Sequence, residues 1–161
     1  MVIVRKSRIF VKFLFYVLFL FKGDVFMKEV SGTLFFKDGK VLLVKPRKRP
    51  TLQVVGGSVE DGESFFEAAV RECYEELGDK AIFESNNIKF LMDFNEQATS
   101  NPNLKIHMNL FVYEGDLEGK LTTSEEIEYF KWFGIDDDYD LLSYALRNVI
   151  IPYCIEHKLI Y

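Results

Sequence analysis

Residues 64–78, with the sequence SFFEAAVRECYEELG, give the strongest local folding signal in the chain. Ser64 and Glu67 have the spacing of a capping box, which starts a helix, and Gly78 favours its end. At about 100° per residue, the apolar side chains of this helix gather on one side. We expect that side to be buried, with Phe66, Ala69, Val70, Cys73 and Leu77 facing inward. Such a helix needs a second layer to pack against, so the rest of the chain must supply a sheet or further helices.

The segments around this helix have the pattern of β-strands. Residues 30–37 and 40–45 are rich in β-formers and flank Asp38-Gly39, a strong signal for a hairpin turn. Further strands are predicted over residues 52–55, 88–94, 104–115 and 128–135. Near the C-terminus, Asp136 to Asp138 can cap a helix that is kinked at Pro152 and bears Leu141, Leu142, Ala145, Val149 and Ile150. No repeat or low-complexity linker divides the 161 residues, which predicts one α+β domain.

Composition and charge exclude several classes of function. The two cysteines, Cys73 and Cys154, lie far apart and form no CxxC motif, so neither a disulfide framework nor a zinc site is indicated. We therefore expect a reducing, cytoplasmic location. The formal net charge is −5, and because residues 1–26 hold five basic residues and one acidic residue, residues 27–161 carry −9. Such an acidic domain is a poor partner for polymeric nucleic acid.

The first 26 residues differ from the rest and hold six of the sixteen phenylalanines. Their apolar run from Phe13 to Phe21 is shorter than the roughly 20 residues of a transmembrane helix. No small-residue cleavage site of a signal peptide follows it. Met27 is followed at once by a strand-turn-strand pattern, so we expect a start assigned too early and a domain over residues 27–161. A membrane-tethered protein is the weaker alternative, and the intact mass of the protein from its native host distinguishes the two.

The predicted helix also carries three glutamates on one arc, at positions 72, 75 and 76. Like charges at this spacing each cost a few tenths of a kcal/mol in an isolated helix. A cluster of glutamates on a solvated helix face is common, and carboxylate count alone favours that structural explanation. Grouped carboxylates are also what a hard divalent cation binds, and Mg²⁺ takes a few of them together with water and phosphate oxygens.

The order of residues around these glutamates favours the metal-binding interpretation. The stretch resembles the Nudix box, the signature of the Nudix hydrolase family. The positions that match it at every required spacing are Gly57, Glu63, Arg71, Glu72, Cys73, Glu75, Glu76 and Gly78. Two positions depart from the family pattern: Asp79 replaces an aliphatic residue and Val55 replaces a proline. Both lie at the edges of the motif and leave its acidic positions intact.

The resemblance implies a Nudix fold, an α/β/α sandwich with a mixed β-sheet, and hydrolysis of a nucleoside diphosphate linked to another moiety. It implies Mg²⁺ as cofactor, with Mn²⁺ as a substitute, bound by Glu72, Glu75 and Glu76 and by the Gly56 carbonyl. Arg71 and Glu63 would hold the acidic side chains in place. One carboxylate must accept the proton of the attacking water. Relatives often place such an acid in the loop before a late strand, where we name Glu126, with Glu125 as its rival, so the catalytic set is Glu75, Glu76, Glu126, Arg71 and Glu63.

Substrate and partners are less constrained by the sequence. Residues 93–98, DFNEQA, lack the proline and tyrosine that often accompany ADP-ribose or dinucleoside polyphosphate hydrolysis in the family. We expect a small nucleotide-type substrate, and the alternative is a catalytically silent Nudix-fold domain that binds nucleotides or regulates. The basic loop 45–50 is expected to be solvated, or else to face substrate phosphates. His107 is expected to be an imidazole that lies in the core or is bonded to a partner, and Cys73 is expected to be buried. Many relatives are dimers, and the aromatic content is compatible with a homodimer.

Overall fold

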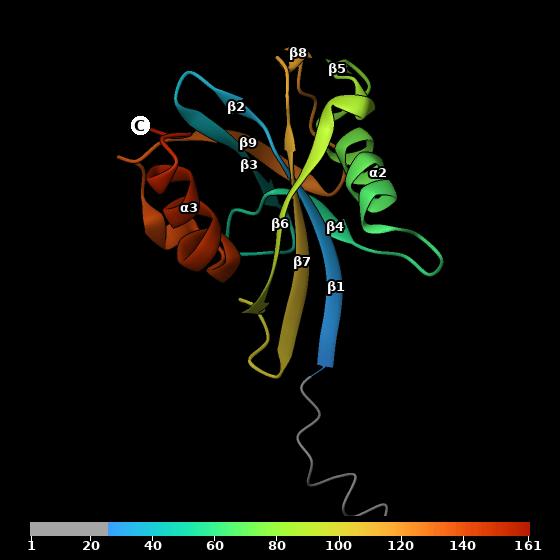
Figure 1. Cartoon of the computed structure of the whole chain (residues 1–161), viewed down its shortest axis with the longest axis vertical. Coiled ribbons are helices and arrows are strands. Elements are labelled where there is room, and N and C mark those ends of the chain that lie inside the picture. The colour runs from blue at the N-terminus through green and yellow to red at the C-terminus, as the bar shows by residue number, and fades with distance from the viewer. Residues whose placement is uncertain (1–25) are drawn as a thin grey trace, which may run out of the picture.

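The computed structural model describes residues 26–161, in which strands form the centre and helices lie on two sides (Figure 1). The strands are β1 Phe26–Leu34, β2 Phe36–Lys37, β3 Lys40–Pro46, β4 Val55–Ser58, β5 Ala81–Ile82, β6 Ile88–Gln97, β7 Leu104–Tyr113, β8 Glu118–Gly119 and β9 Ile127–Phe133. The helical segments are α2 Phe65–Leu77, the 3-10 turns Ser85–Asn87 and Tyr139–Leu141, the π-helical turn Leu146–Ile150 and α3 Ile151–Glu156. The expectations for the N-terminal segment lie, except for Phe26, outside the described residues.

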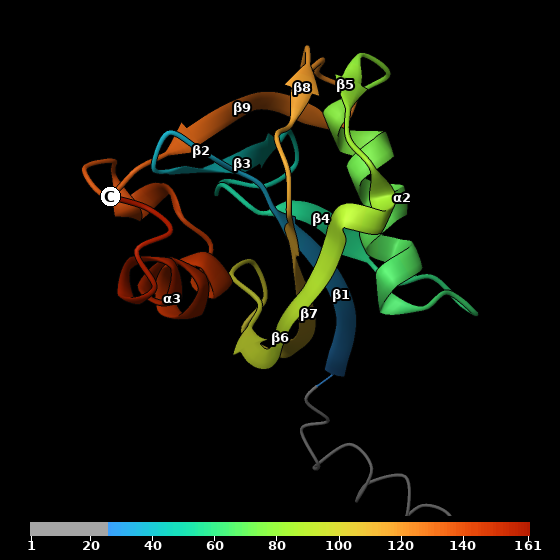
Figure 2. The ribbon, with the colours of Figure 1, turned by 45° about the horizontal axis from the view of Figure 1, so that its top comes forward.

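The main sheet has the order β4-β1-β7-β6 and is mixed. β1 pairs antiparallel with β4 and parallel with β7, and β7 pairs antiparallel with β6. A second sheet has the order β2-β3-β9, and β5 and β8 form a small two-stranded pair. Helix α2 covers one side of the strands and α3 lies on the other, as Figure 2 shows. This layering confirms the predicted α+β class and mixed sheet.

The hairpin predicted from Asp38-Gly39 joins β2 to β3. Both turn residues have positive φ, 50° and 69°, which matches the twist of the strands that they connect. β3 then runs through the interior, and its apolar side chains alternate between two cores. Val41 and Leu43 point to the core beside the C-terminal helices, whereas Leu42 and Val44 point to the core beneath α2. An uninterrupted apolar run is therefore needed, because this strand is buried on both faces.

Helix α2 buries most of the side predicted for it: Val70 is half-buried, and Phe66 is the exception. Ala69, Cys73 and Leu77 are fully buried as expected, but Phe66 is 42% exposed. The helix packs on β4 and β1, and Phe66 meets the Phe111 ring of β7 edge-on, with the ring centroids 5.9 Å apart. The prediction for Phe66 was wrong because a helical pattern shows which residues share a side and not how much of each one the neighbouring elements cover.

The predicted C-terminal helix is present, but it begins at Tyr144 and runs to Glu156, with a π-helical turn over Leu146–Ile150. Asp138 caps the 3-10 turn by accepting from the Asp140 amide, and a π-helical turn precedes α3. Pro152 lies in the first turn of α3, where the missing proline N–H costs little. Ile150 and Ile151 both keep helical backbone angles, so the chain passes from the π-helical turn into α3 without a break. Within residues 26–161, no helix is both long and apolar enough to span a bilayer.

Candidate active site

Helix α2 is positioned by its N-terminal cap. The Ser64 side chain accepts from the Glu67 amide at 3.2 Å, and the Glu67 carboxylate accepts from the Ser64 amide at 2.8 Å. The confirmed capping box satisfies two of the backbone donors that a helix start leaves free. The Ser31 hydroxyl of β1 donates to the Phe65 carbonyl at 2.7 Å, which ties the same turn to the central sheet. The carboxylates that follow along α2 are thus held in a fixed place.

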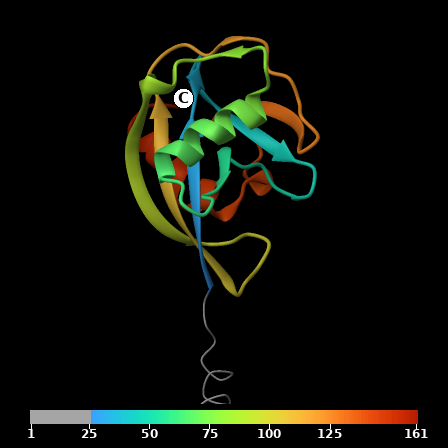
Figure 3. The same ribbon diagram turned by 90° about the vertical axis from the view of Figure 1, so that its right-hand side faces the viewer.

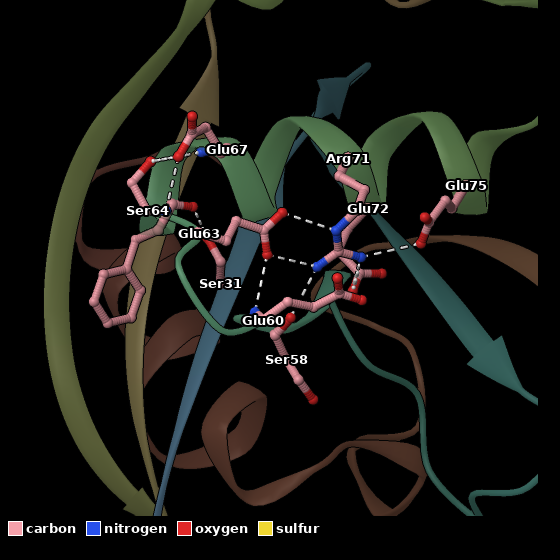
Figure 4. Close-up of polar contacts among 10 residues, drawn as sticks. Ser31, Ser58, Glu60, Glu63, Ser64, Glu67, Arg71, Glu72 and Glu75 are labelled. Carbon is pink, nitrogen blue, oxygen red and sulfur yellow. Dashed lines mark hydrogen bonds and ion pairs between the residues drawn. The ribbon is translucent and has the colours of Figure 1, made fainter.

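Arg71 is the centre of a charged network on α2 (Figure 4). Its Nε and Nη2 donate to the two oxygens of Glu63 at 2.8 and 2.9 Å, and Nη2 also donates to the Ser58 carbonyl at 2.9 Å. Its Nη1 donates to Glu72 at 2.9 Å and to Glu75 at 3.1 Å. The bond from Arg71 lowers the pKa of Glu63 to about 2. Arg71 therefore compensates part of the repulsion among the clustered carboxylates of α2.

Glu76 is the buried carboxylate of the group, with only 8% of its surface exposed. It accepts one hydrogen bond from the Gly56 amide at 2.8 Å. Burial raises the pKa of Glu76 to about 8, and the charges of Glu72, Glu126 and Glu75 act in the same direction. Within residues 26–161 no cation forms a salt bridge with Glu76, and Arg71 bonds to Glu63, Glu72 and Glu75 instead.

Glu72 lies half-buried beside the glycine pair at the start of β4. A Cβ atom on Gly57 would come within 2.2 Å of Glu72 Oε1, so a side chain at this position would displace the carboxylate. Gly56 has φ +151°, and a Cβ atom there would meet the Ser31 carbonyl oxygen at 2.1 Å. Burial raises the pKa of Glu72, against the bond from Arg71. Both glycines are therefore required by close packing of the backbone against the site.

A cavity of about 570 Å³ collects part of the predicted set. Its lining includes Glu72, Glu76, Glu126 and Gly56. Glu126 lies in the loop before β9, which is fixed because the Arg47 amide donates to the Glu126 carbonyl at 2.9 Å. The negative charge of Glu126 acts to raise the pKa of both Glu72 and Glu76.

The remaining predicted residues lie outside the lining of this cavity. Glu75 is exposed and bonded to Arg71, and Glu125 is exposed next to Glu126 in the chain. Arg71 and Glu63 face a separate, open depression of about 540 Å³ at the start of α2. The structure thus joins Glu72, Glu76 and Glu126 in one cavity, and places Arg71 with Glu63 behind them.

Several cavity residues had no signal in the sequence. Lys28 and Val30 of β1 line it, as do Ile106 and Met108 of β7, because alternate residues of two paired strands face the same way. Arg49 of the basic loop also lines it, which supports the second interpretation of that loop. These residues can be recognised as neighbours only once the parallel pairing of β1 with β7 is known.

Two residues set aside in the sequence have structural roles. His107 is bonded to partners, as predicted: its Nδ1 lies 2.6 Å from Glu29 Oε2 and its Nε2 lies 3.3 Å from Asp93 Oδ2. The bond with Glu29, followed by that with Asp93, raises the pKa of His107. Cys73 is fully buried in the core beneath α2, and burial raises the pKa of its thiol to about 12. A neutral, enclosed thiol is not a nucleophile.

The chemistry of the cavity carboxylates fits a hard divalent cation. In residues 26–161, no group of three or more His, Cys, Asp or Glu side chains is already spaced to hold a metal ion. Two of the carboxylates are engaged in other hydrogen bonds: Arg71 donates to Glu72, and the Gly56 amide donates to Glu76. The buried Glu76 nevertheless shares the cavity with Glu72 and Glu126, and within residues 26–161 only Glu72 of these three is bonded to a cation, Arg71. A Mg²⁺ ion would relieve this excess of negative charge with the oxygen ligands it prefers.

The chain matches a known protein family and is similar to several solved structures. The family model described as NUDIX domain matches residues 26–148. A MutT NUDIX hydrolase from Burkholderia pseudomallei has a similar structure, with 24% identity, a TM-score of 0.62, and coverage of 75% of this chain and 93% of its own. An Ap4A hydrolase from C. elegans has 21% identity and a TM-score of 0.57, covering 80% of this chain and 97% of its own.

A third similar structure belongs to a larger protein. It is a bifunctional NMN adenylyltransferase/ADP ribose pyrophosphatase from Francisella tularensis, complexed with AMP and a manganese ion. The identity is 16% and the TM-score 0.61, over 91% of this chain and 46% of that one. No curated protein matches the chain. The structural likenesses show the Nudix fold, and the family match over residues 26–148 shows that the chain belongs to the NUDIX domain family of pyrophosphohydrolases.

Proposed function

We propose that the protein is a Mg²⁺-dependent hydrolase that cleaves the pyrophosphate bond of a nucleoside diphosphate linked to another moiety. The observation that carries this proposal is the gathering of Glu72, Glu76 and Glu126 in the lining of one cavity, beside Gly56. A regulatory or binding domain has no need for three carboxylates that repel one another in a partly buried place. The alternative, a catalytically silent Nudix-fold domain, keeps the same fold without turnover.

The cation would be held by Glu72 and Glu76, with Glu126 and the Gly56 carbonyl as neighbouring oxygen donors. Glu75 belongs to the proposed set on the strength of its position in the motif. When bound, Mg²⁺ supplies positive charge that neutralises the pyrophosphate oxygens and favours deprotonation of the attacking water. We propose Mn²⁺ as a substitute, in line with the manganese ion in the Francisella tularensis structure.

Arg71 is proposed to position the carboxylates. Two oxygens of Glu63 and the Ser58 carbonyl fix its guanidinium, so that Nη1 remains directed at Glu72. A bidentate pair of this kind resists rotation better than a lysine could. Glu63 thus acts on the site through Arg71 and need not touch the substrate.

Glu126 is proposed as the proton acceptor for the attacking water. It lines the cavity, and its backbone is held at both sides by the bond from Arg47 and by donation of its own amide to the Ser124 hydroxyl at 3.2 Å. Its side chain is exposed, so water can reach it. Glu125, its rival, has the same charge one residue earlier and provides a matched control.

The rest of the cavity suits a small nucleotide derivative. The apolar side chains of Val30, Ile106 and Met108 offer a surface for a base or sugar, whereas Lys28 and Arg49 supply cations for phosphate oxygens. A volume of about 570 Å³ falls in the usual range for small-molecule sites. The acidic domain argues against polymeric nucleic acid as substrate. We also propose a cytoplasmic location, consistent with two buried, free cysteines.

The test is phosphate or pyrophosphate release by the full chain with nucleoside triphosphates, oxidised triphosphates, nucleotide sugars, ADP-ribose and dinucleotides. Each substrate is assayed with Mg²⁺, with Mn²⁺ and with EDTA. We expect release that requires metal and is lost in Glu72→Gln and Glu76→Gln. Glu126→Gln should lower kcat by roughly 10²- to 10⁴-fold, the usual worth of a general base, whereas Glu125→Gln should leave it nearly unchanged.

Two results would redirect the proposal. A larger loss in Glu125→Gln than in Glu126→Gln would transfer the base role to Glu125. If no substrate in the panel is hydrolysed while a nucleotide still raises the melting temperature, the silent binding domain becomes the better description.

A further inference from the structure

The carboxylate cavity has an acidic end and a basic end. Its lining includes five charged side chains: Lys28, Arg49, Glu72, Glu76 and Glu126. Glu76 accepts from the Gly56 amide, and Gly56 pairs with Gly32 of β1. Lys28 precedes Gly32 by four residues on the same strand, a separation of about 13 Å at about 3.3 Å per residue. The backbone of Lys28 therefore lies well away from the proposed metal ligands.

Arg49 lies at the same end of the cavity as Lys28, beside the loop that joins β6 to β7. Arg49 Nη1 lies 3.5 Å from Ser100 Oγ in this loop. The loop, residues 98–103, leads into Leu104, where β7 pairs with the start of β1. Figure 3 shows the loop beside the start of β1 and away from α2. Within residues 26–161 neither Lys28 nor Arg49 takes part in a salt bridge, so both cations are available to a ligand.

The same loop offers hydrogen-bond donors to this end of the cavity. Thr99, Ser100 and Asn101 all line it. Thr99 Oγ1 accepts from the Tyr144 amide at 2.9 Å, and Asn101 Oδ1 accepts from the Asn103 amide at 3.0 Å. These contacts use the side-chain oxygens and leave the hydroxyl hydrogens and the Asn101 Nδ2 as donors. Cations beside hydroxyl and amide donors are suited to the oxygens of a phosphate.

Gln97 holds the loop in this shape. Its Nε2 donates to the carbonyls of Asn101 and Leu104 at 2.7 and 2.6 Å, and the Ala98 amide donates to the Leu104 carbonyl at 2.9 Å. These bonds leave Gln97 Oε1 as an acceptor, which suits an N–H group of a base and not a phosphate. Because the loop is already closed by its own hydrogen bonds, little ordering of the chain is needed when a ligand binds.

Apolar side chains separate the two ends of the cavity. Val30 pairs with Met108 and Lys28 pairs with Ile106, and all four residues line the cavity. A pyrophosphate at the carboxylates and a nucleoside over the apolar side chains would bring the far side of the nucleoside to Lys28. A chain of further phosphates would instead lie on the apolar stretch without hydrogen-bond partners, which is unfavourable. The arrangement therefore favours a second anionic group on the nucleoside over a longer phosphate chain.

We propose that the substrate carries a second phosphate on its ribose, separate from the pyrophosphate that is cleaved. Lys28 and Arg49 bind this ribose phosphate, together with donors of the loop 98–103, and so determine specificity. The substrate class is then a nucleoside 5′-diphosphate derivative with a further phosphate at the 2′ or 3′ position. This inference rests on the proposed function for the position of the pyrophosphate.

The first experiment measures binding to the full chain by isothermal titration calorimetry in the presence of Mg²⁺. The ligands are AMP, adenosine 3′,5′-bisphosphate and adenosine 2′,5′-bisphosphate, which differ by one ribose phosphate and contain no pyrophosphate bond. We expect one bisphosphate to bind at least about tenfold more tightly than AMP, because hydrogen bonds between charged groups are the stronger kind. The preference should shrink as NaCl is raised, since salt screens exposed charges.

Substitutions assign this preference to the two cations. Lys28→Gln and Arg49→Gln should each remove most of the difference between AMP and the preferred bisphosphate, whereas Lys28→Arg should keep it. Lys37→Gln is the matched control, because Lys37 is exposed on β2 and lies outside the cavity lining. Circular dichroism and the melting temperature show whether each variant is folded. Equal binding of AMP and both bisphosphates, or a preference that survives both glutamine variants, would overturn the proposal.

The second experiment separates this inference from the proposed function. The ratio kcat/KM is measured with Mg²⁺ for NADH against NADPH and for dephospho-coenzyme A against coenzyme A, because one member of each pair carries the extra ribose phosphate. We expect that member to be hydrolysed at least about tenfold more efficiently in one pair, with the advantage lost in Lys28→Gln. Equal values within both hydrolysed pairs would overturn the proposal. A binding preference without hydrolysis of any compound would support the ribose phosphate site and count against the proposed hydrolase.

Discussion

Replacing Glu76 by glutamine should stabilise the metal-free protein while removing its activity. Burial raises the pKa of Glu76 from 4.5 to about 8, so the folded protein holds a proton that the unfolded chain has lost at neutral pH. The unfolded state then binds fewer protons than the folded state, and stability falls as pH rises between these two values. At pH 7 the buried Glu76 therefore lowers the free energy of unfolding by about 3 kcal/mol, because each pH unit above the unfolded-state pKa of 4.5 costs about 1.4 kcal/mol. A glutamine of the same shape can still accept from the Gly56 amide and carries no such cost.

The assay is urea unfolding of the wild type and Glu76→Gln in EDTA, at several pH values from 4.5 to 8. The difference in free energy of unfolding should be near zero at the acid end and grow to about 3 kcal/mol in favour of glutamine at pH 7. For a chain of this size, that corresponds to a melting temperature roughly 6–12 °C higher. Glu75→Gln is the matched control, because Glu75 is exposed and its replacement removes no buried carboxylate.

Added Mg²⁺ supplies a second measurement on the same two proteins. If Glu76 is a ligand, Mg²⁺ should raise the stability of the wild type and have much less effect on the variant, since ligand binding to the folded state stabilises it. A Glu76→Gln protein that is no more stable than the wild type at pH 7 in EDTA would refute the reasoning. The burial of this carboxylate would then carry no electrostatic penalty.

Three further substitutions test the fold itself. Gly78→Ala should destabilise by about 1–3 kcal/mol in thermal unfolding, because φ is +85° and its Cβ atom would lie 2.0 Å from Thr122 Oγ1. Leu110→Ala should cost about 2–5 kcal/mol in urea unfolding, because Leu110 is fully buried. The pKa of His107 is raised above 6.5 chiefly by its bond with Glu29. Protonated His107 therefore stabilises the fold fully below pH 6.5, and this stabilisation is lost as pH rises through the folded-state pKa. His107→Gln should therefore flatten stability against pH above 6.5, and an unchanged slope would contradict this assignment.

The parts of the fold that depend on neighbours in sequence were predictable. The capping box of Ser64 and Glu67 defined the start of α2, and Asp38-Gly39 defined the hairpin. Both are local signals, in which a few side chains satisfy nearby backbone groups or permit a positive φ. The Nudix box gave the spacing of the acidic residues on α2, and the structure shows how Arg71 compensates their repulsion.

The parts that depend on distant contacts were not predictable. The sequence placed Glu75 and Glu76 on one arc of the helix, but the position of the glycine pair in β4 makes Glu76 buried and leaves Glu75 exposed. In the same way, Lys28 joins the cavity only because β1 lies beside β7. Phe66 shares a side of α2 with buried residues and is still 42% exposed. Each outcome is set by the packing of whole elements and not by local spacing.

The parallel pairing of β1 with β7 also affects how the protein is made. Glu29 and His107 lie side by side, although 78 residues separate them in the chain. The N-terminal strand therefore leaves the ribosome long before its central partner does, and contacts this distant in sequence form slowly. Helix α2 lies between the two and can form earlier, but its carboxylates then have no finished cavity around them. The site is thus completed late in synthesis, only after β7 has been made and has paired with β1.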